Sequence, residues 1–166
     1  VLVVGAAGSE GLAVVRLARL RGGRVTGQCP IEAADAVLAA GAAAILPRTR
    51  MPEAASFDLV IDMTAAGCGI DRLAALRPGG RYAAVGSAGW ALAEGARCRV
   101  HLNDLSLFGG TSQSREIFAG LVTVIEAGAP SGMAESHLPR AESRIAIHSE
   151  TRSLPGKQSL APIKIR

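Results

Sequence analysis

Apolar and polar positions follow two different periods along the first 130 residues. The chain opens with a fully apolar run of strand-forming residues, VLVV at positions 1–4, and apolar residues then recur with the period of a helix from Leu12 to Leu20. Because short apolar strands joined by crossovers are typical of buried parallel sheets, we expect an α/β fold with helices on both faces of the sheet. The same patterns predict further strands at residues 24–28, 43–46, 57–63, 81–86 and 102–108, and further helices at residues 32–40, 71–76 and 112–127.

The pattern weakens beyond Gly128, where four prolines interrupt it. No clean helix is predicted past residues 141–147, and the last four residues (IKIR) indicate a lone terminal strand. We therefore expect one domain over residues 1–130 and a separate C-terminal segment over residues 131–166. Val1 already lies inside an apolar run, so we also expect that further chain precedes it.

Composition narrows the class of protein. Hydrophobic residues make up 49% of the 166 positions and charged residues 19%, which excludes general disorder. No run of about 18 apolar residues lacks charge, so no membrane span is expected. The net charge is +4, and the densest cluster of positive charge consists of the arginines at positions 16, 19, 21 and 24. Their helical spacing indicates a solvated helix face rather than a nucleic-acid surface.

The cysteines favour a reducing compartment. Cys29, Cys68 and Cys98 are odd in number and lie far apart, with no CxxC motif and no larger grouping of Cys and His at the spacing of a metal site. We therefore expect a cytoplasmic protein with neither a disulfide framework nor a bound metal.

The strongest local motif is VLVVGAAGSEGLAVV, in which a strand runs into a glycine turn that opens a helix. The first amides of a helix have no internal partner and the helix dipole favours negative charge there, so this arrangement suits an anion. Gly8 would let a pyrophosphate approach the backbone, and Gly11 would let the helix pack closely on the strand. Ala6 stands where the usual G-x-G-x-x-G pattern has its first glycine, and no Lys-Ser/Thr follows, which excludes a Walker P-loop. The alternative is a tight turn that binds no ligand.

Four segments together resemble the cofactor domain of medium-chain dehydrogenases/reductases, especially its quinone oxidoreductase-like branch. They are VLVVGAAGSEGLAVVRLARLRGGRVTG, FDLVIDMTAAG, LAALRPGGRYAAVGSAG and LNDLSLFGGTSQSREIFAGLVTVIEAG, in the order in which the family has them. The resemblance implies a Rossmann fold with a six-stranded parallel sheet of order 3-2-1-4-5-6 that binds NAD(P)H. The tail, with Gly156-Lys157 and then IKIR, is similar to the family's closing strand, which returns to the catalytic domain.

In the family a preceding GroES-like domain carries the substrate pocket and, in some members, zinc. Nothing similar to that domain is present in these residues, so we assign no catalytic residue and no metal ligand. In open α/β sheets ligands bind at the carboxyl ends of the strands. We therefore expect the site to combine the glycine turn, the end of the second strand and the residues at the ends of the fourth, fifth and sixth strands. The candidate cofactor residues are Ala6, Ala7, Gly8, Ser9, Glu10, Gly11, Gln28, Cys29, Arg48, Thr64, Ala65, Gly86, Ser87, Phe108 and Gly109.

Two departures from the family pattern bear on the cofactor. Glu10 lies in the first helical turn, where an inward carboxylate would repel a pyrophosphate and an outward one would cost little. No acid ends the second strand at Gln28-Cys29, which removes the usual NAD signature. Arg48, near where related quinone reductases contact the 2′-phosphate, favours NADP slightly over NAD. The alternative is that Arg48 and Arg50 are solvated loop residues.

The favoured function is therefore the cofactor domain of an NAD(P)-dependent oxidoreductase that transfers hydride from NADPH to a quinone or unsaturated carbonyl. The alternatives are a degenerate, non-catalytic nucleotide-binding module and another Rossmann enzyme such as a methyltransferase. No nucleic-acid or membrane partner is expected. The strand at residues 102–108 would lie at an edge of the sheet. The resembled family joins two copies at this edge, so we expect a homodimer there.

Overall fold

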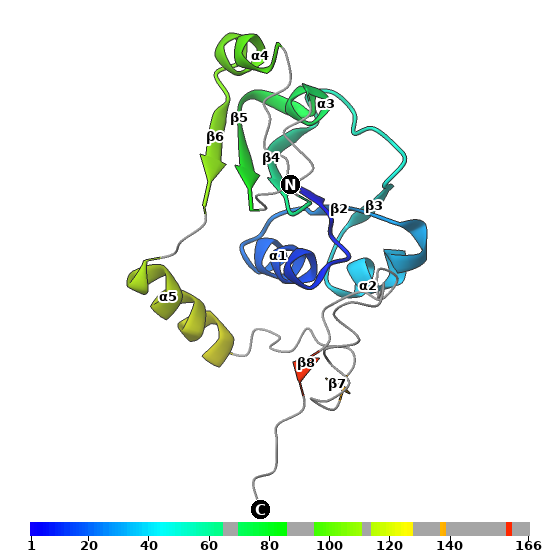
Figure 1. The fold of residues 1–166 in the computed structure, drawn as a ribbon, viewed down its shortest axis with the longest axis vertical. Helices are drawn as coiled ribbons and strands as arrows, with labels where there is room; N and C mark the ends of the chain where they lie inside the picture. Colours follow the sequence, from blue (N-terminus) through cyan, green and yellow to red (C-terminus); the bar gives the residue numbers. More distant parts are fainter. Residues whose placement is uncertain (65–69, 86–94, 111–113, 128–136, 139–158, 161–166) are drawn as a thin grey trace, which may run out of the picture.

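The computed structural model describes residues 1–64, 70–85, 95–110, 114–127, 137–138 and 159–160. Its centre is a parallel sheet with helices on both sides (Figure 1). The six strands are β1 (Leu2–Val4), β2 (Thr26–Cys29), β3 (Ala44–Pro47), β4 (Phe57–Asp62), β5 (Leu76–Ala84) and β6 (Ser106–Gly109). The helices are α1 (Ser9–Leu20), α2 (Ala34–Ala39) with the short 3₁₀ turn η1 (Ile31–Ala33) before it, α3 (Ile70–Ala74), α4 (Ala96–Leu102) and α5 (Arg115–Glu126).

The strand order is β3-β2-β1-β4-β5-β6, and every neighbouring pair is parallel. The predicted Rossmann fold and its strand order are therefore confirmed. The chain moves outward from β1 to β3 and then returns to the other side of β1 with β4. In such sheets this switch point leaves a crevice at the carboxyl ends of the two strands, which here are Val4 and Asp62.

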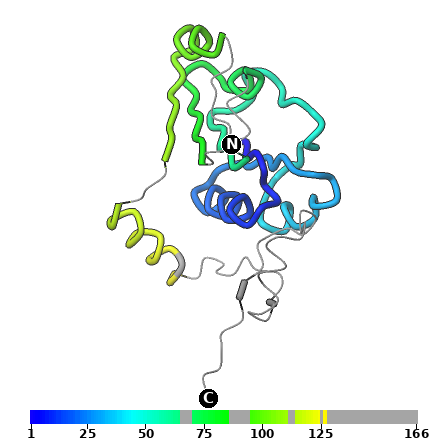
Figure 2. Tube along the Cα trace, viewed as in Figure 1, coloured from blue at the N-terminus to red at the C-terminus, as the bar shows by residue number. Residues whose placement is uncertain are grey.

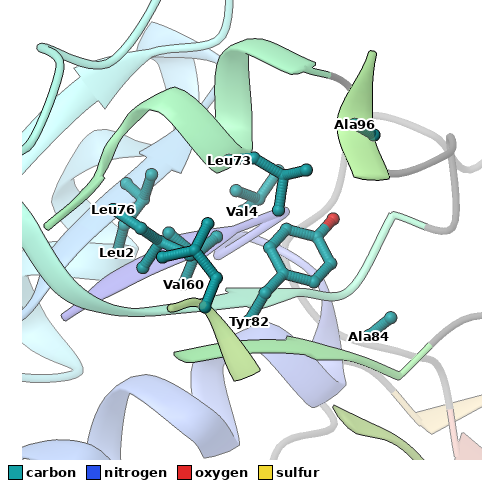
Figure 3. Close-up of a cluster of buried hydrophobic side chains, with 9 residues drawn as sticks. Leu2, Val4, Val60, Leu73, Leu76, Tyr82, Ala84 and Ala96 are labelled. Carbon is teal, nitrogen blue, oxygen red and sulfur yellow. The ribbon is translucent and has the colours of Figure 1, made fainter. Parts of the chain in front are cut away.

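Alternation along β1 divides the core into two layers. Val3 belongs to a buried cluster with side chains of α1 and α2, among them Leu12, Val15 and Val37. Its neighbours Leu2 and Val4 point to the opposite face and join a second cluster that includes Leu73, Tyr82 and Ala96 (Figure 3). The central strand β1 is therefore buried on both faces, as the apolar pattern predicted.

Two elements differ from the sequence prediction. Residues 77–80 (RPGG) lie between the predicted helix at 71–76 and the predicted strand at 81–86, but the structure includes them in β5. The pairing with β4 shifts register there, from Leu76 opposite Phe57 to Arg81 opposite Leu59. Gly79 has a φ of +75° in this irregularity. The extra residues are accommodated in the strand, and β5 begins five residues earlier than the prediction of 81–86.

The predicted strand at residues 102–108 is also wrong at its start. Leu102 ends α4, a helix that the apolar pattern did not predict, and β6 begins only at Ser106. Gly95, with a φ of +80°, precedes that helix. The edge strand is therefore four residues long.

Helix α5 carries an apolar face that the described residues do not cover. Ile117 and Phe118 are 60% and 64% exposed, and the helix stands apart from the sheet (Figure 2). Among the described residues, every helix is too short or too polar to pass through a lipid bilayer. Two-residue strands β7 (His137–Leu138) and β8 (Ser159–Leu160) pair in parallel, and the predicted terminal strand at residues 163–166 lies outside the described residues.

Candidate functional site

The glycine turn between β1 and α1 has the geometry of an anion-binding loop. Gly5 adopts a φ of +77°, and the amides of Gly5 and Ala6 both donate to the carbonyl oxygen of Gln28 at 3.1 Å. Gly8 is the N-cap of α1, in an extended conformation, and its amide donates to the oxygen of Gly5 at 3.2 Å. The turn is thereby fixed on the end of β2, and the first amides of α1 follow directly after it.

The available space differs between the glycines. A Cβ on Gly11 would come within 2.2 Å of the Gly5 oxygen, so close packing of the helix on the turn requires glycine there, as predicted. A Cβ on Gly8 would meet only the Gly5 oxygen, at 3.6 Å, and Gly8 is exposed. Gly5 was not among the candidate site residues, although a glycine directly after a strand is the signal that could have identified it.

Ser9 and Glu10 begin the helix in different environments. The hydroxyl oxygen of Ser9 is buried and has no hydrogen-bond partner among the described residues. Buried hydroxyls are normally paired, so a bound group that accepts this hydrogen bond fits the site. Glu10 is exposed. The residues of the turn therefore fit a pyrophosphate, with open backbone at Gly8 and an unused donor at Ser9.

A second part of the site lies at the end of β2. The Gln28 side chain, which is only 8% exposed, donates through Nε2 to the carbonyl oxygen of Arg50 at 2.9 Å. The amide of Arg48 donates to the oxygen of Cys29 at 2.9 Å. These bonds hold the loop after β3 against β2 and bring two exposed arginines to the edge of the sheet. The Cys29 side chain is in the core, and burial raises the pKa of its thiol, with a smaller contribution from Glu32.

The third part is a buried carboxylate at the end of β4. Asp62 is 2% exposed, and its Oδ1 accepts hydrogen bonds from the Thr64 amide (2.9 Å) and the Thr64 hydroxyl (2.7 Å). Its Oδ2 accepts a hydrogen bond from the Tyr82 hydroxyl at 2.6 Å and forms an ion pair with Arg72. The two bonds to Thr64 make Asp62 a cap of the loop after β4. Its partners Arg72 and Tyr82 were not expected from the sequence.

Of the candidate residues at the ends of β4, β5 and β6, the structure describes only some. Phe108 and Gly109 pair with Ala83 and Ala84 of β5, so they lie at the same edge of the sheet as the end of that strand. Ala65, Gly86 and Ser87 lie outside the described residues. In the described part of the chain, no three His, Cys, Asp or Glu side chains are grouped as a metal site.

A surface hollow of about 620 Å³ occurs elsewhere, at the start of β6. It is lined by Arg97, Val100, His101, Asp104, Leu105 and Leu107. These residues belong to α4, to β6 and to the connection between them. The hollow is therefore separate from the edge of the sheet at which the strands end.

Comparisons with known proteins agree with this geometry. The chain is 30% identical to a thermostable alcohol dehydrogenase from Pyrobaculum aerophilum, with a TM-score of 0.83. The match covers 97% of this chain and 49% of the alcohol dehydrogenase. It is 23% identical to E. coli K-12 YhdH with bound NADPH (TM-score 0.76; 96% of this chain, 53% of that chain). It is 20% identical to the quinone oxidoreductase from Coxiella burnetii (TM-score 0.72; 99% and 52%). No protein-family model matches the chain, and no curated protein matches its sequence at a significant level.

The chain thus spans about half the length of the solved structures that it matches. Its fold and glycine turn are those of the Rossmann class, the class of dinucleotide-binding folds. The structural neighbours are medium-chain alcohol dehydrogenases and quinone oxidoreductases, which confirms the resemblance predicted from the sequence and supports a nucleotide-binding domain of that family.

Proposed function

We propose that this chain is the nicotinamide-cofactor domain of an NADP-dependent, medium-chain oxidoreductase of the cytoplasm that reduces a quinone or an unsaturated carbonyl. The observation that carries the proposal is the start of α1. There an open glycine backbone and the unpartnered Ser9 hydroxyl adjoin the switch point between β1 and β4. Bound NADPH would supply the hydride, and the domain contributes binding and orientation.

Each part of the site has a role in this proposal. The amides that follow Gly8 bind the pyrophosphate, helped by the helix dipole, and Ser9 donates its hydroxyl proton to a phosphate oxygen. Glu10 is exposed, which favours the outward orientation that costs little affinity. Thr64 lies on the adenosine side, and Phe108 and Gly109 flank the nicotinamide.

The preference for NADP rests on charge at the end of β2. No acid ends β2 at Gln28-Cys29, where NAD-binding proteins place one for the ribose hydroxyls, and the first carboxylate after the strand is Glu32 in η1. The loop after β3 presents Arg48 and Arg50. Guanidinium groups bind phosphate with charge-assisted hydrogen bonds. The structural neighbours include an NADPH-bound protein and an NAD-dependent alcohol dehydrogenase, so both cofactors occur among similar folds.

Titration calorimetry with NADPH and NADH tests this proposal. Arg48→Ala should weaken NADPH binding by about tenfold or more, because one charge-assisted hydrogen bond is lost, and should leave NADH binding unchanged. The matched control is Arg24→Ala, which removes an exposed arginine just before β2, at the opposite end of the same strand. Equal affinity for both cofactors, unaltered by Arg48→Ala, would contradict the role of Arg48.

The alternative is a degenerate module that binds a nucleotide without supporting catalysis. Glu10 in the first turn and the missing ribose acid are the observations that favour it. If the wild-type chain binds ADP but neither NADPH nor NADH, and Glu10→Val restores binding of the dinucleotides, the alternative is correct. If the wild type binds NADPH, the oxidoreductase reading is favoured.

A further inference from the structure

The buried carboxylate of Asp62 has more partners than a loop cap requires. Four groups surround it: the amide and hydroxyl of Thr64 on Oδ1, and Tyr82 and Arg72 on Oδ2. The partners come from the loop after β4, from β5 and from α3. Arg72 also donates to the Thr64 hydroxyl at 3.3 Å. The carboxylate therefore connects three elements beside the switch point of the sheet.

Stability alone does not account for this arrangement. A buried ion pair must recover the cost of desolvating both charges, and well-packed apolar residues of similar size are often as stabilising or more so. The surroundings of Tyr82 are apolar, with Val4, Val60 and Leu73 in the same cluster (Figure 3). The presence of a carboxylate beside this apolar cluster raises the question of which residues it orients.

The oriented residue is Thr64, and Thr64 touches the glycine turn. Its amide and its hydroxyl are both held by Oδ1 of Asp62, which fixes the side-chain rotamer. The methyl group then lies against Gly5, since a Cβ on Gly5 would come within 2.7 Å of the Thr64 Cγ2 atom. The contact leaves no room for Gly5 to move toward β4.

Gly5 in turn sets the position of the helix start. Its oxygen accepts the amide of Gly8 at 3.2 Å, and Gly11 packs against the same oxygen. On the other side, the amide of Gly5 is bonded to Gln28. A displacement of Thr64 would therefore be transmitted through Gly5 to Gly8 and to the first amides of α1.

We propose that Asp62 is a positioning residue of the dinucleotide site: by fixing Thr64 against Gly5, it holds the glycine turn in the form that receives the pyrophosphate. This inference rests on the proposed function. Asp62 is only 2% exposed, so in this proposal it acts on the cofactor through Thr64 and not by direct contact. Arg72 and Tyr82, on its other oxygen, compensate the buried charge from the core side.

Three substitutions around the Asp62 carboxylate distinguish a positioning role from a purely stabilising one. Thr64→Ala removes the Oδ1 hydroxyl bond and the methyl contact with Gly5. It should weaken NADPH and NADH by the same factor, about threefold or more, because both share the pyrophosphate. Tyr82→Phe removes one hydroxyl from Oδ2 and keeps the Thr64 bonds, so it should lower the melting temperature and change either affinity by less than about twofold. Thr64→Ser, which keeps the hydroxyl but lacks the methyl group, should bind with intermediate affinity.

Amide NMR spectra of the cofactor-free chain give a second readout. Thr64→Ala should shift the resonances of Gly5, Gly8 and Ser9, and Tyr82→Phe should leave them in place. If the wild type binds NADPH and Thr64→Ala binds it equally well with unshifted resonances, the positioning role is refuted while the proposed function stands. If the wild type binds neither dinucleotide, the proposed function fails, and the role of Asp62 in cofactor binding fails with it.

Discussion

Two glycines of the turn are used for different physical reasons. Gly5 supplies a positive φ directly after β1, and Gly11 supplies the absence of a side chain where α1 crosses the Gly5 oxygen. The second requirement is steric and involves backbone atoms, which cannot move aside as a flexible side chain can. Gly11 is therefore the residue of the turn at which the smallest change should have the largest effect.

Gly11→Ala should lower the free energy of unfolding by about 1–3 kcal/mol, because the added methyl group overlaps the backbone of Gly5 and Ala6. It should also weaken cofactor binding, since α1 must move away from the turn. Urea denaturation followed by circular dichroism measures the first effect. The control is Gly120→Ala in α5, where nothing lies within 4 Å of the new Cβ and helix propensity predicts a gain of up to about 1 kcal/mol. A Gly11→Ala chain as stable as the wild type would contradict the packing argument.

The two edge strands of the sheet differ in how they are protected. β3 ends on Pro47, which lacks a backbone donor, and proline is one of the residues that protect edges from pairing. β6 has neither proline nor lysine, and Phe108 on it is 53% exposed. Leu102, which the sequence had assigned to this strand, is 78% exposed at the end of α4. Unpaired backbone groups and apolar side chains therefore occur together at this edge.

A homodimer through β6 remains our prediction, now over residues 106–109 with Leu102 beside them. A two-fold pairing of identical strands is self-complementary and closes at two copies. Sedimentation at micromolar concentration should give about twice the chain mass. Ser106→Pro should shift the chain toward the monomer, whereas Ser106→Ala, which keeps the backbone donor, should not. A monomer at every concentration would refute this interface.

The whole molecule corresponds to about half of each similar oxidoreductase. The sequence suggests no catalytic group, and the described residues hold no grouping of side chains for a metal. A cofactor domain can bind and orient a dinucleotide, but the substrate pocket of the resembled family belongs to another domain. Binding and turnover should therefore be separable in this chain.

We expect the 166-residue chain to bind NADPH and yet to show no dehydrogenase activity by itself. The measurement is the decrease in NADPH absorbance with a panel of quinones and enones, at cofactor concentrations that saturate binding. The same preparation should be checked for binding by calorimetry, so that an inactive chain is distinguished from an unfolded one. Clear turnover would show that the substrate site lies within these residues.

Much of the fold followed from local patterns in the sequence. The apolar runs at residues 1–4 and 57–63 and the strand–turn–helix motif around Gly8 were sufficient for the element types and, through the resemblance, for the strand order. These features depend on residues close together along the chain, whose periodicity reflects burial on both faces of a sheet. The close packing at Gly11 was predicted from the glycine pattern of the turn, which is also local in the sequence.

Contacts between distant residues were decided only by the tertiary structure. The RPGG segment lies within β5, but the residues on either side of it, Leu76 and Arg81, are the ones that pair with β4, at Phe57 and Leu59. Helix α4 forms over Ala96–Leu102, where the apolar pattern had predicted no element before Leu102. Asp62 meets Arg72 and Tyr82 across separations of 10 and 20 residues, and Gln28 meets Arg50 across 22. No periodicity encodes such pairs, because they depend on how parallel strands align their carboxyl ends. The sequence by itself thus determined a Rossmann-type sheet with a glycine turn at the start of its first helix, and the tertiary structure determined which side chains hold that turn in place.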